Sequence, residues 1–469
     1  MKARLLTTLA ALLLALTSWA KGVEIDGIHY LLNSSTNTAT VTYTGSTNTN
    51  PNPPSTAYTG NITIPASVTY SGTTYTVTGI EEYAFSGCSG LTSISISSSV
   101  TNIGGWAFEG CTGLASINLP ASVTTIGDDA FWCCTGLTSI NIPSSVTAIG
   151  HGAFSGCTGL TSVSIPASVT TIGNYAFAGC EGLASIKVEA GNIAYDSREN
   201  CNAIIETASN TLVAGCMNTT VPNSVTAIGD YAFFGCTGLT SFTIPASVTA
   251  IGDYAFSDCS GLASIKVEAG NTAYDSRENC NAIIKTASNT LVAGCMNTTI
   301  PNSVTAIGDG AFLGRTGLAS ISIPASVTTI GNRAFYGCTS LTSINIPSSV
   351  TTIGYKAFLD CTGLKSISIP ASVTAIGDYA FLGCTGLTNI YAEHTDPAAY
   401  NCSASAFYNV SAILHVPTGS KEAYANTEPW SKFKNIVEAA AQTARHPVQS
   451  RTHKQKGARK VGSNTKKTK

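Results

Sequence analysis

The stretch from Leu137 to Gly159 reads LTSINIPSSVTAIGHGAFSGCTG, and near-copies of it fill the chain from Leu91 to Leu387. An Ala-Phe pair marks each copy, and its phenylalanines are 23 residues apart except for two gaps of 56, which equal one period plus 33 residues. These phenylalanines are Phe85, Phe108, Phe131, Phe154, Phe177, Phe233, Phe256, Phe312, Phe335, Phe358 and Phe381. A fixed period of this length predicts a solenoid, in which each coil buries its apolar face against the next coil.

Within one unit, numbered from its leucine, apolar residues occupy positions 1, 4, 6, 10, 13, 17, 18 and 21. Positions 4 and 6 alternate with polar residues, which predicts a half-buried strand that ends at Pro143. Val146 to Ile149 predicts a second short strand. Gly150 then suits a turn with positive φ. We expect positions 15 to 20 to form one helical turn that directs Phe154 inward.

The repeated pattern LxxIxIPxSVTxIGxxAFxGCxG resembles the BspA-like leucine-rich repeat of bacterial surface proteins, and the resemblance covers roughly residues 22–438. It implies a β-rich leucine-rich-repeat solenoid of the α/β type, with short strands, single helical turns, and N- and C-terminal caps. It also implies adhesion to host matrix proteins or to other cells. Solenoids of one type bind unrelated ligands, so the resemblance specifies the fold better than the partner.

The N-terminal residues 1–20 have the pattern of a secretory signal peptide. Lys2 and Arg4 form its basic end, Leu5 to Leu16 its apolar segment, and Ser18-Trp19-Ala20 a small-x-small cleavage site. The apolar run is too short to serve as a membrane anchor, and no later segment is apolar enough to cross a bilayer. The sequence therefore predicts a protein that is secreted or displayed at the cell surface.

The repeats divide the rest of the chain. Residues 21–80 predict a β-rich N-terminal cap, with strands at 28–32, 40–43, 61–64 and 75–78. The solenoid occupies 81–390, and 391–441 predict a C-terminal cap with Trp430 and Phe433 inside. Residues 442–469 hold nine Lys or Arg and no acidic residue. We expect this tail to be disordered and solvated, or else to contact an anionic surface.

Two near-identical inserts, 189–220 and 268–299, interrupt the repeats. Each holds two apolar runs around a polar turn, which predicts a β-hairpin. If the first turn is centred between Ala208 and Ser209, Cys201 and Cys216 lie directly opposite each other, as do Cys280 and Cys295 in the second insert. Facing residues are near disulfide range, so we hypothesise two cross-hairpin disulfides; the alternative is four buried thiols.

The chain has 16 cysteines, and ten of them recur at position 21 of the repeat, where we expect a stacked row of small buried side chains. Metal ligation is not expected, because no CxxC motif and no Cys/His cluster occurs. Acidic residues in the inserts, such as Asp196 and Glu199, could suggest calcium, but their spacing fits no known loop and Arg198 is a ready partner.

The composition argues against catalysis. Charged residues make up only 11% of the chain, the six histidines are scattered, and no HExxH, GxSxG or phosphate-loop motif is present. Without the nine tail cations and those of the leader, 13 basic and 26 acidic residues remain, a net charge of −13 that disfavours nucleic acid. We expect no enzyme activity and no cofactor.

Two surfaces could bind a macromolecule. Positions 3 and 5 predict a ladder of hydroxyl and amide side chains on the strand face. Positions 15, 16 and 19 place aromatic residues along one edge, where exposed rings are typical of recognition sites. These residues are Tyr83, Trp106, Trp132, Tyr175, Tyr231, Phe234, Tyr254, Tyr336, Tyr355 and Tyr379. The alternative is that each ring only covers its neighbour. We predict a host or bacterial surface protein as partner, with a glycan or envelope ligand, or a spacer role without any partner, as alternatives.

Overall fold

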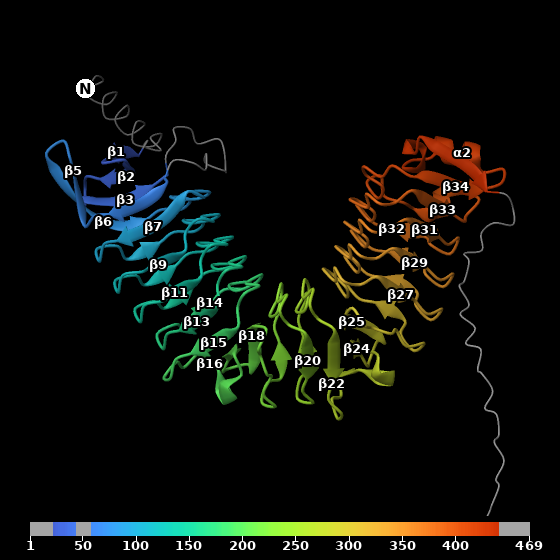
Figure 1. Cartoon of the computed structure of the whole chain (residues 1–469), viewed down its shortest axis with the longest axis horizontal. Helices are drawn as coiled ribbons and strands as arrows, with labels where there is room; N and C mark the ends of the chain where they lie inside the picture. Colours follow the sequence, from blue (N-terminus) through green and yellow to red (C-terminus); the bar gives the residue numbers. More distant parts are fainter. Residues whose placement is uncertain (1–21, 44–57, 440–469) are drawn as a thin grey trace, which may run out of the picture.

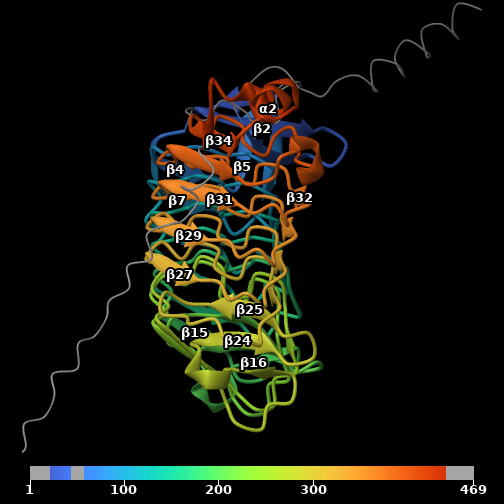
Figure 2. The ribbon, with the colours of Figure 1, turned by 90° about the vertical axis from the view of Figure 1, so that its right-hand side faces the viewer.

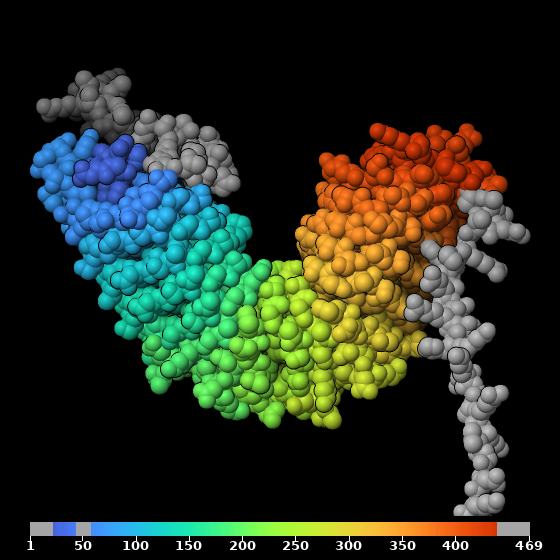
Figure 3. Space-filling model, in the orientation of Figure 1, coloured from blue at the N-terminus to red at the C-terminus, as the bar shows by residue number. Residues whose placement is uncertain are grey.

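A computed structural model describes residues 22–43 and 58–439. The chain winds into a solenoid, as predicted, and the solenoid curves into an arch with an N-terminal arm, a bend and a C-terminal arm (Figures 1 and 3). The predicted signal peptide at 1–20 and the predicted basic tail at 442–469 lie outside the described residues.

Most coils contribute a first strand from positions 3 to 6. These strands pair in parallel and in register, with Ser139 opposite Ser116 and Asn141 opposite Asn118. The isoleucines between them point inward, because side chains alternate across a strand. The first strands are β7 (Leu91–Ile96), β9 (Ser116–Asn118), β11 (Ser139–Asn141), β13 (Ser162–Ile165), β15 (Ser185–Val188), β20 (Ser241–Ile244), β22 (Ser264–Val267), β27 (Ser320–Ser322), β29 (Ser343–Asn345), β31 (Ser366–Ile369) and β33 (Asn389–Ala392).

A second strand of two residues follows the proline turn in each regular coil and lies on the opposite face of the solenoid, as β29 and β32 show in Figure 2. It is shorter than the predicted segment Val146 to Ile149. The second strands are β8 (Asn102–Ile103), β10 (Thr125–Ile126), β12 (Ala148–Ile149), β14 (Thr171–Ile172), β19 (Ala227–Ile228), β21 (Ala250–Ile251), β26 (Ala306–Ile307), β28 (Thr329–Ile330), β30 (Thr352–Ile353) and β32 (Ala375–Ile376).

Positions 15 to 20, which we call the Ala-Phe turn, do not form the predicted helical turn. Their alternate N–H groups donate to carbonyls of the following coil: Asp129 N to His151 O at 2.7 Å, Phe131 N to Ala153 O at 2.8 Å, and Cys133 N to Ser155 O at 2.8 Å. Because these groups bond between coils, they are not available for the hydrogen bonds within a helix. The turns therefore form a third ladder along one edge of the solenoid.

Gly150 does not have the predicted positive φ. Glycine is required there by close approach, since a Cβ atom on Gly150 would lie 2.5 Å from the backbone N of Asp128 in the preceding coil. The left-handed backbone occurs two residues later, at position 16.

Within each run of regular coils the interior is a stack of identical side chains, and the stacks are separated at the irregular coils. Phenylalanine rings of successive coils lie parallel, with centroids 5.1 Å apart for Phe85 and Phe108 and 5.2 Å apart for Phe108 and Phe131. The position-21 thiols are buried, and in eight coils the sulfur lies 3.0–3.2 Å from the phenylalanine carbonyl of the preceding coil, as Cys134 does from Phe108. The thiol row thus supplies hydrogen-bond donors as well as apolar contact.

Each predicted insert belongs to an irregular coil of 33 residues, 183–215 or 262–294. The coil starts with a regular first strand and then adds a hairpin, whose second strand takes the place of the second strand of a coil, so that Leu212 pairs with Ile228. The chain then enters the next coil at Cys216 without making an Ala-Phe turn. The added elements are β16 (Tyr195–Asp196), η1 (Arg198–Asn200), β17 (Ala203–Glu206) and β18 (Thr211–Gly215), with the copies β23 (Tyr274–Asp275), η2 (Arg277–Asn279), β24 (Ala282–Lys285) and β25 (Thr290–Gly294).

These irregular coils act as wedges. On the Ala-Phe edge the flanking coils bond directly across them, through Gly179 N to Phe234 O at 2.8 Å and Asp258 N to Leu313 O at 3.0 Å. On the proline edge the hairpin segment adds width, and Asn192 Nδ2 donates to Pro166 O of the preceding coil at 2.8 Å. The solenoid therefore curves toward its Ala-Phe edge, and β16 and β24 lie on the outer side of the bend (Figure 1).

We call the Ala-Phe edge the inner edge, the region around coil 183–215 the first bend, and that around 262–294 the second bend. At the first bend the backbone of Gly215 crosses the ring of Phe233, and at the second Gly294 crosses Phe312. A Cβ atom at either glycine would lie 2.1 Å from the ring. Glycine is thus the residue that lets the chain return without an Ala-Phe turn.

The four hairpin cysteines do not face one another as predicted. A register shift between Ile204 and Ile205 places Ala203 opposite Gly215, so that Cys216 faces Asn202 instead of Cys201. The second hairpin has the same shift between Ile283 and Ile284. Cys201, Cys216, Cys280 and Cys295 are buried free thiols in the structure, and the register argument for disulfides fails.

Both ends of the solenoid are covered. At the N-terminus β6 pairs with β8 and β4 with β7, so the cap extends both strand faces. At the C-terminus Trp430 and Phe433 are buried, as expected, against Phe407. The cap elements are β1 (Val23–Ile25), β2 (Ile28–Asn33), β3 (Thr38–Thr42), β4 (Gly60–Ile64), β5 (Ser67–Tyr70) and β6 (Thr73–Ile80), then η3 (Pro397–Tyr400), β34 (Ile413–Pro417), α2 (Lys421–Asn426), η4 (Trp430–Lys432) and β35 (Asn435–Ala439). Within the two described ranges no helix has the length and apolarity needed to span a bilayer.

Candidate binding surface

In most coils the inner edge presents a large side chain from an unusual backbone conformation. Position 16 is left-handed in all eleven Ala-Phe turns, with φ of 50° at Trp106 and 63° at Tyr175. Such a backbone favours glycine, yet glycine occupies only two of these positions, Gly152 and Gly310. The others carry Tyr83, Trp106, Asp129, Tyr175, Tyr231, Tyr254, Arg333, Lys356 and Tyr379. The repeat therefore keeps bulky residues where the backbone disfavours them.

The aromatic residues singled out from the sequence fall into groups along this edge. Trp106 stacks on Tyr83 with centroids 5.1 Å apart, and Tyr231 contacts Tyr175 at 4.0 Å. Tyr231 also contacts Phe234 at 5.7 Å and stacks on Tyr254 at 5.3 Å. These rings cover one another in part, as the alternative interpretation expects.

Other members of the row are more open. Trp132 is 41% exposed and Tyr379 36% exposed, which is high for such large apolar side chains. Tyr336 and Tyr355 are half-buried. The row thus combines a stacked central group with accessible rings in both arms.

Two cations that the sequence analysis missed complete the row in the C-terminal arm. Arg333 Nη1 donates to the Tyr254 hydroxyl at 2.8 Å, and its guanidinium carbon lies 5.1 Å from the centroid of the Tyr355 ring. Lys356 Nζ lies 5.0 Å from the Tyr355 centroid and 5.9 Å from that of Tyr379. The signal was available, since Arg and Lys replace tyrosine at position 16 in two consecutive copies.

A hollow opens on the inner edge at the second bend. Its lining consists of Tyr231, Phe234, Tyr254, Asp258, Leu313, Arg333, Tyr336 and Gly337, and its volume is about 390 Å³. Tyr254 leans across Gly310, where a Cβ atom would lie 2.7 Å from the tyrosine ring. Glycine at position 310 therefore allows Tyr254 to reach Arg333. We call this feature the second-bend hollow.

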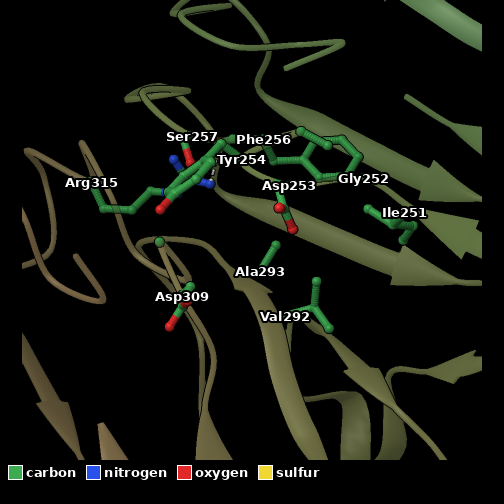
Figure 4. A pocket seen from close by; sticks show the side chains of 12 residues that line it. Ile251, Gly252, Asp253, Tyr254, Phe256, Ser257, Val292, Ala293, Asp309 and Arg315 are labelled. Atoms are coloured by element: carbon green, nitrogen blue, oxygen red, sulfur yellow. Dashed lines mark hydrogen bonds between the residues drawn. The ribbon is translucent and has the colours of Figure 1, made fainter. Parts of the chain in front are cut away.

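A smaller cavity of about 100 Å³ shares Tyr254 with this hollow and contains Arg315 (Figure 4). Arg315 stands where ten other coils have cysteine and is only 1% exposed. Its guanidinium donates to the carbonyls of Phe256 at 2.7 Å, Gly294 at 2.9 Å and Leu313 at 3.1 Å. At the first bend the equivalent Cys236 has its sulfur 3.8 Å from Gly215 O. One buried cation thus ties three carbonyls together at the second bend.

The remaining reactive groups are occupied or suppressed. Burial raises the pKa of Cys157 to about 12 and that of Cys259 to about 11, so these thiols stay protonated at neutral pH. Asp196 pairs with Arg198 at 2.8 Å and Asp275 with Arg277 at 2.7 Å, so the aspartate of each insert is bound internally. In the part of the chain that the structure describes, no group of three His, Cys, Asp or Glu could hold a metal ion.

The strand face has the expected polar ladder. Ser116 and Asn118 of β9 lie beside Ser139 and Asn141 of β11, all exposed. The molecule therefore has a strand face rich in hydroxyl and amide groups and an aromatic and cationic inner edge.

Comparison with known proteins identifies the family of the repeats. The model of the BspA type leucine-rich repeat region matches residues 78–205, 214–290 and 293–414. A leucine-rich cell surface protein from Faecalibacterium prausnitzii is similar to this chain, with 30% identity, coverage of 91% of this chain and 97% of that one, and a TM-score of 0.50. A leucine-rich repeat protein from Bacteroides ovatus has 29% identity, coverage of 84% and 99%, and a TM-score of 0.40. No curated protein matches significantly, and no enzyme family is indicated. On these grounds the chain belongs to the BspA-type leucine-rich-repeat family of bacterial surface proteins.

Proposed function

We propose that this protein is a secreted or cell-surface adhesin, which binds a protein on a host cell or on another bacterium through its inner edge. The observation that carries the proposal is the row of aromatic and cationic residues along the inner edge, most of them at position 16. A left-handed backbone at a bulky residue costs roughly 1–3 kcal/mol and is typical of sites where function compensates the strain.

The chemistry of the row supports a protein partner. Tyrosine, tryptophan and arginine dominate the binding energy of protein interfaces, because they combine large contact area with hydrogen-bond donors. Trp132 and Tyr379 present accessible rings in the two arms, and Arg333 lies at the second bend between them in sequence. A partner that enters the arch can contact all three regions at once (Figure 3).

The test is a binding screen of the purified full chain against immobilised matrix proteins and a glycan array. Trp132→Ala and Tyr379→Ala should each weaken capture of a matrix protein by about tenfold or more, the loss typical of a central aromatic contact. Ser116→Ala, on the strand face, serves as the matched control and should leave binding unchanged.

The screen also separates the other functions. Glycan binding that depends on Trp132 and Tyr379, without any protein capture, would favour a glycan or envelope ligand. A partner whose affinity falls with Ser116→Ala and not with the inner-edge variants would move the site to the strand face. Absence of any ligand would favour a structural spacer.

A further inference from the structure

We infer that the second-bend hollow binds an acidic segment of the partner protein, with a carboxylate on Arg333 and apolar side chains against the tyrosines. The inference rests on the proposed function, because it specifies the partner's chemistry at one part of the inner edge. Side chains from four regular coils, on both sides of the irregular coil 262–294, line the site. The charge of these side chains favours a carboxylate.

Unpaired positive charge is the first observation. Among the residues that the structure describes, the ion pairs within 4 Å are Arg198–Asp196, Arg277–Asp275 and Lys432–Glu428. Arg333 and Lys356 belong to none of them, and both lie half-buried against tyrosine rings. Ring faces stabilise a cation without using its capacity for a carboxylate. The two cations lie in successive coils, so one extended segment can reach both.

The nearby carboxylates are already occupied. Asp309 accepts from the backbone N of Asn332 at 2.7 Å and from its side-chain amide at 3.1 Å. Asp378 accepts from the hydroxyls of Ser403 and Ser405, and these hydrogen bonds lower its pKa. Asp309 and Asp378 thus accept hydrogen bonds from other groups, and neither forms an ion pair with Arg333 or Lys356.

Asp258 is the one carboxyl that lines the hollow itself. Burial raises its pKa, and the charge of the neighbouring buried Arg315 acts in the opposite direction. Arg315 therefore offsets part of the negative charge of Asp258, and Arg333 and Lys356 supply the positive charge on the inner edge for an incoming ligand.

The geometry of Arg333 favours a carboxylate over a simple counter-ion. Its Nη1 is fixed by the Tyr254 hydroxyl at 2.8 Å, and tyrosine rings lie 5.1 and 5.7 Å from its guanidinium carbon. A guanidinium held in one plane can offer two parallel N–H groups to a carboxylate, which gives shorter and stronger hydrogen bonds than a neutral acceptor. The walls of Phe234, Leu313 and Tyr336 provide apolar contact beside that charge.

The first bend serves as an internal reference. There Tyr175 and Tyr231 occupy position 16 of the flanking coils and contact each other at 4.0 Å, and no cation is present at that position. The acidic-segment site is therefore specific to the second bend, although the two irregular coils are near-copies.

The experiment uses the full chain and an immobilised copolymer of glutamate and tyrosine, with a copolymer of lysine and tyrosine and a heparin surface in parallel. We expect the chain to bind the glutamate copolymer and to lose affinity as salt rises from about 50 to 300 mM. Arg333→Gln should weaken binding by about tenfold or more, as the loss of a charge-assisted hydrogen bond does. Arg333→Lys should recover only part of that loss.

The matched control is Lys266→Gln, which removes one positive charge from the strand face and should change binding less than twofold. Thermal unfolding of each variant would show that the fold is intact. An equal loss from Lys266→Gln and Arg333→Gln, or equal capture by the lysine copolymer, would overturn the inference. So would Arg333-dependent binding to heparin without binding to the glutamate copolymer, which would identify a sulfated glycan. If the copolymer fails while Trp132→Ala still abolishes capture of a matrix protein, the proposed function stands and this inference falls.

Discussion

The two bends are built from almost the same sequence and present different surfaces. The irregular coils 183–215 and 262–294 differ at two of 33 positions, where Ile193 and Glu206 in the first correspond to Thr272 and Lys285 in the second. Both omit the Ala-Phe turn, and both place a glycine on the ring of the following phenylalanine. The wedge and the bend therefore follow from the irregular coil alone.

The residues that distinguish the two bends lie in the flanking regular coils. Tyr231 and Cys236 follow the first wedge, and Gly310 and Arg315 follow the second. At the first bend Tyr231 contacts Tyr175 across the inner edge, while at the second the glycine leaves room for Tyr254 to reach Arg333. The irregular coils thus specify the bend, and residues of the flanking regular coils decide which side chains each bend presents.

Raising the pH should have the largest effect, because it acts on many thiols at once. Burial raises the folded-state pKa of Cys157 to about 12 and of Cys338 to about 12, from an ordinary value of 9.0. The protonated thiol is favoured in the fold, so this stability is fully present below pH 9 and is lost as pH rises toward 12. At the second bend Arg315 takes the place of one of these thiols.

Hydrogen exchange followed through this alkaline transition should show protection lost in the arms before the second bend. Uniform loss of protection, or a fold that is insensitive to pH up to 12, would contradict the thiol assignment.

The next largest effect is expected from truncation of a core side chain between the two bends. Phe256 lies between the two wedges, with its ring stacked on Phe233 at 5.3 Å. Phe256→Ala should lower the free energy of unfolding by about 3–5 kcal/mol, because it removes a buried ring from a stack that cannot collapse freely. Urea unfolding measures the loss, which should be the same for Phe233→Ala if the bends are mechanically alike.

Removal of the buried cation should distinguish the bends. Arg315→Ala leaves three buried carbonyls without their donor, and should cost roughly 3 kcal/mol or more. Cys236→Ala at the first bend should cost about 1 kcal/mol, since it removes one weak donor. The double change Arg315→Cys with Asp258→Gly, which copies the first bend, should restore part of the stability. Equal costs for Arg315→Ala and Cys236→Ala would show that the guanidinium has no special structural role.

The wedge glycines should affect both bends alike. Gly215→Ala and Gly294→Ala each place a methyl group 2.1 Å from a phenylalanine ring, and overpacking of this kind costs about 1–3 kcal/mol. Small-angle scattering should also report a change in the opening of the arch. A neutral substitution at one glycine and not at the other would mean that the two wedges are not equivalent.

The smallest effect is expected on the strand face. Ser264 is exposed on β22, with one hydrogen bond to Asn281 at 3.3 Å. Ser264→Ala should change the free energy of unfolding by less than about 0.5 kcal/mol, and so should Ser185→Ala at the first bend. Losses that approach that of Phe256→Ala would reverse the assignment of inside and outside.

The period of 23 residues was sufficient to predict the solenoid, its two strand faces and the buried phenylalanine and cysteine rows. The conformation of the Ala-Phe turn could not be predicted, because hydrogen bonds to the next coil, and not local propensity, decide it. The prediction that Cys201 faces Cys216 was wrong for a similar reason. The bulge between Ile204 and Ile205 shifts the register by one residue, and counting along the chain does not reveal it.

The candidate site was predicted in part. Aromatic residues at variable positions led to the inner edge, but a search for rings alone passed over Arg333 and Lys356. Contact between Tyr254 and Arg333 depends on the omitted turn at residues 262–294, which brings together coils that are 79 residues apart in sequence. That proximity is a property of the wedge, and a linear reading of the repeats does not contain it.

Because the flanking coils bond directly across each wedge, the geometry of the two bends does not depend on the number of regular coils in either arm. Whole copies of the 23-residue unit can be added to or lost from either arm, because each new coil continues the stacked rows of phenylalanine rings and thiols. The distance between the ends of the two arms can thus change in steps with the number of repeats. The residues that line the second-bend hollow stay the same when the arms change in length.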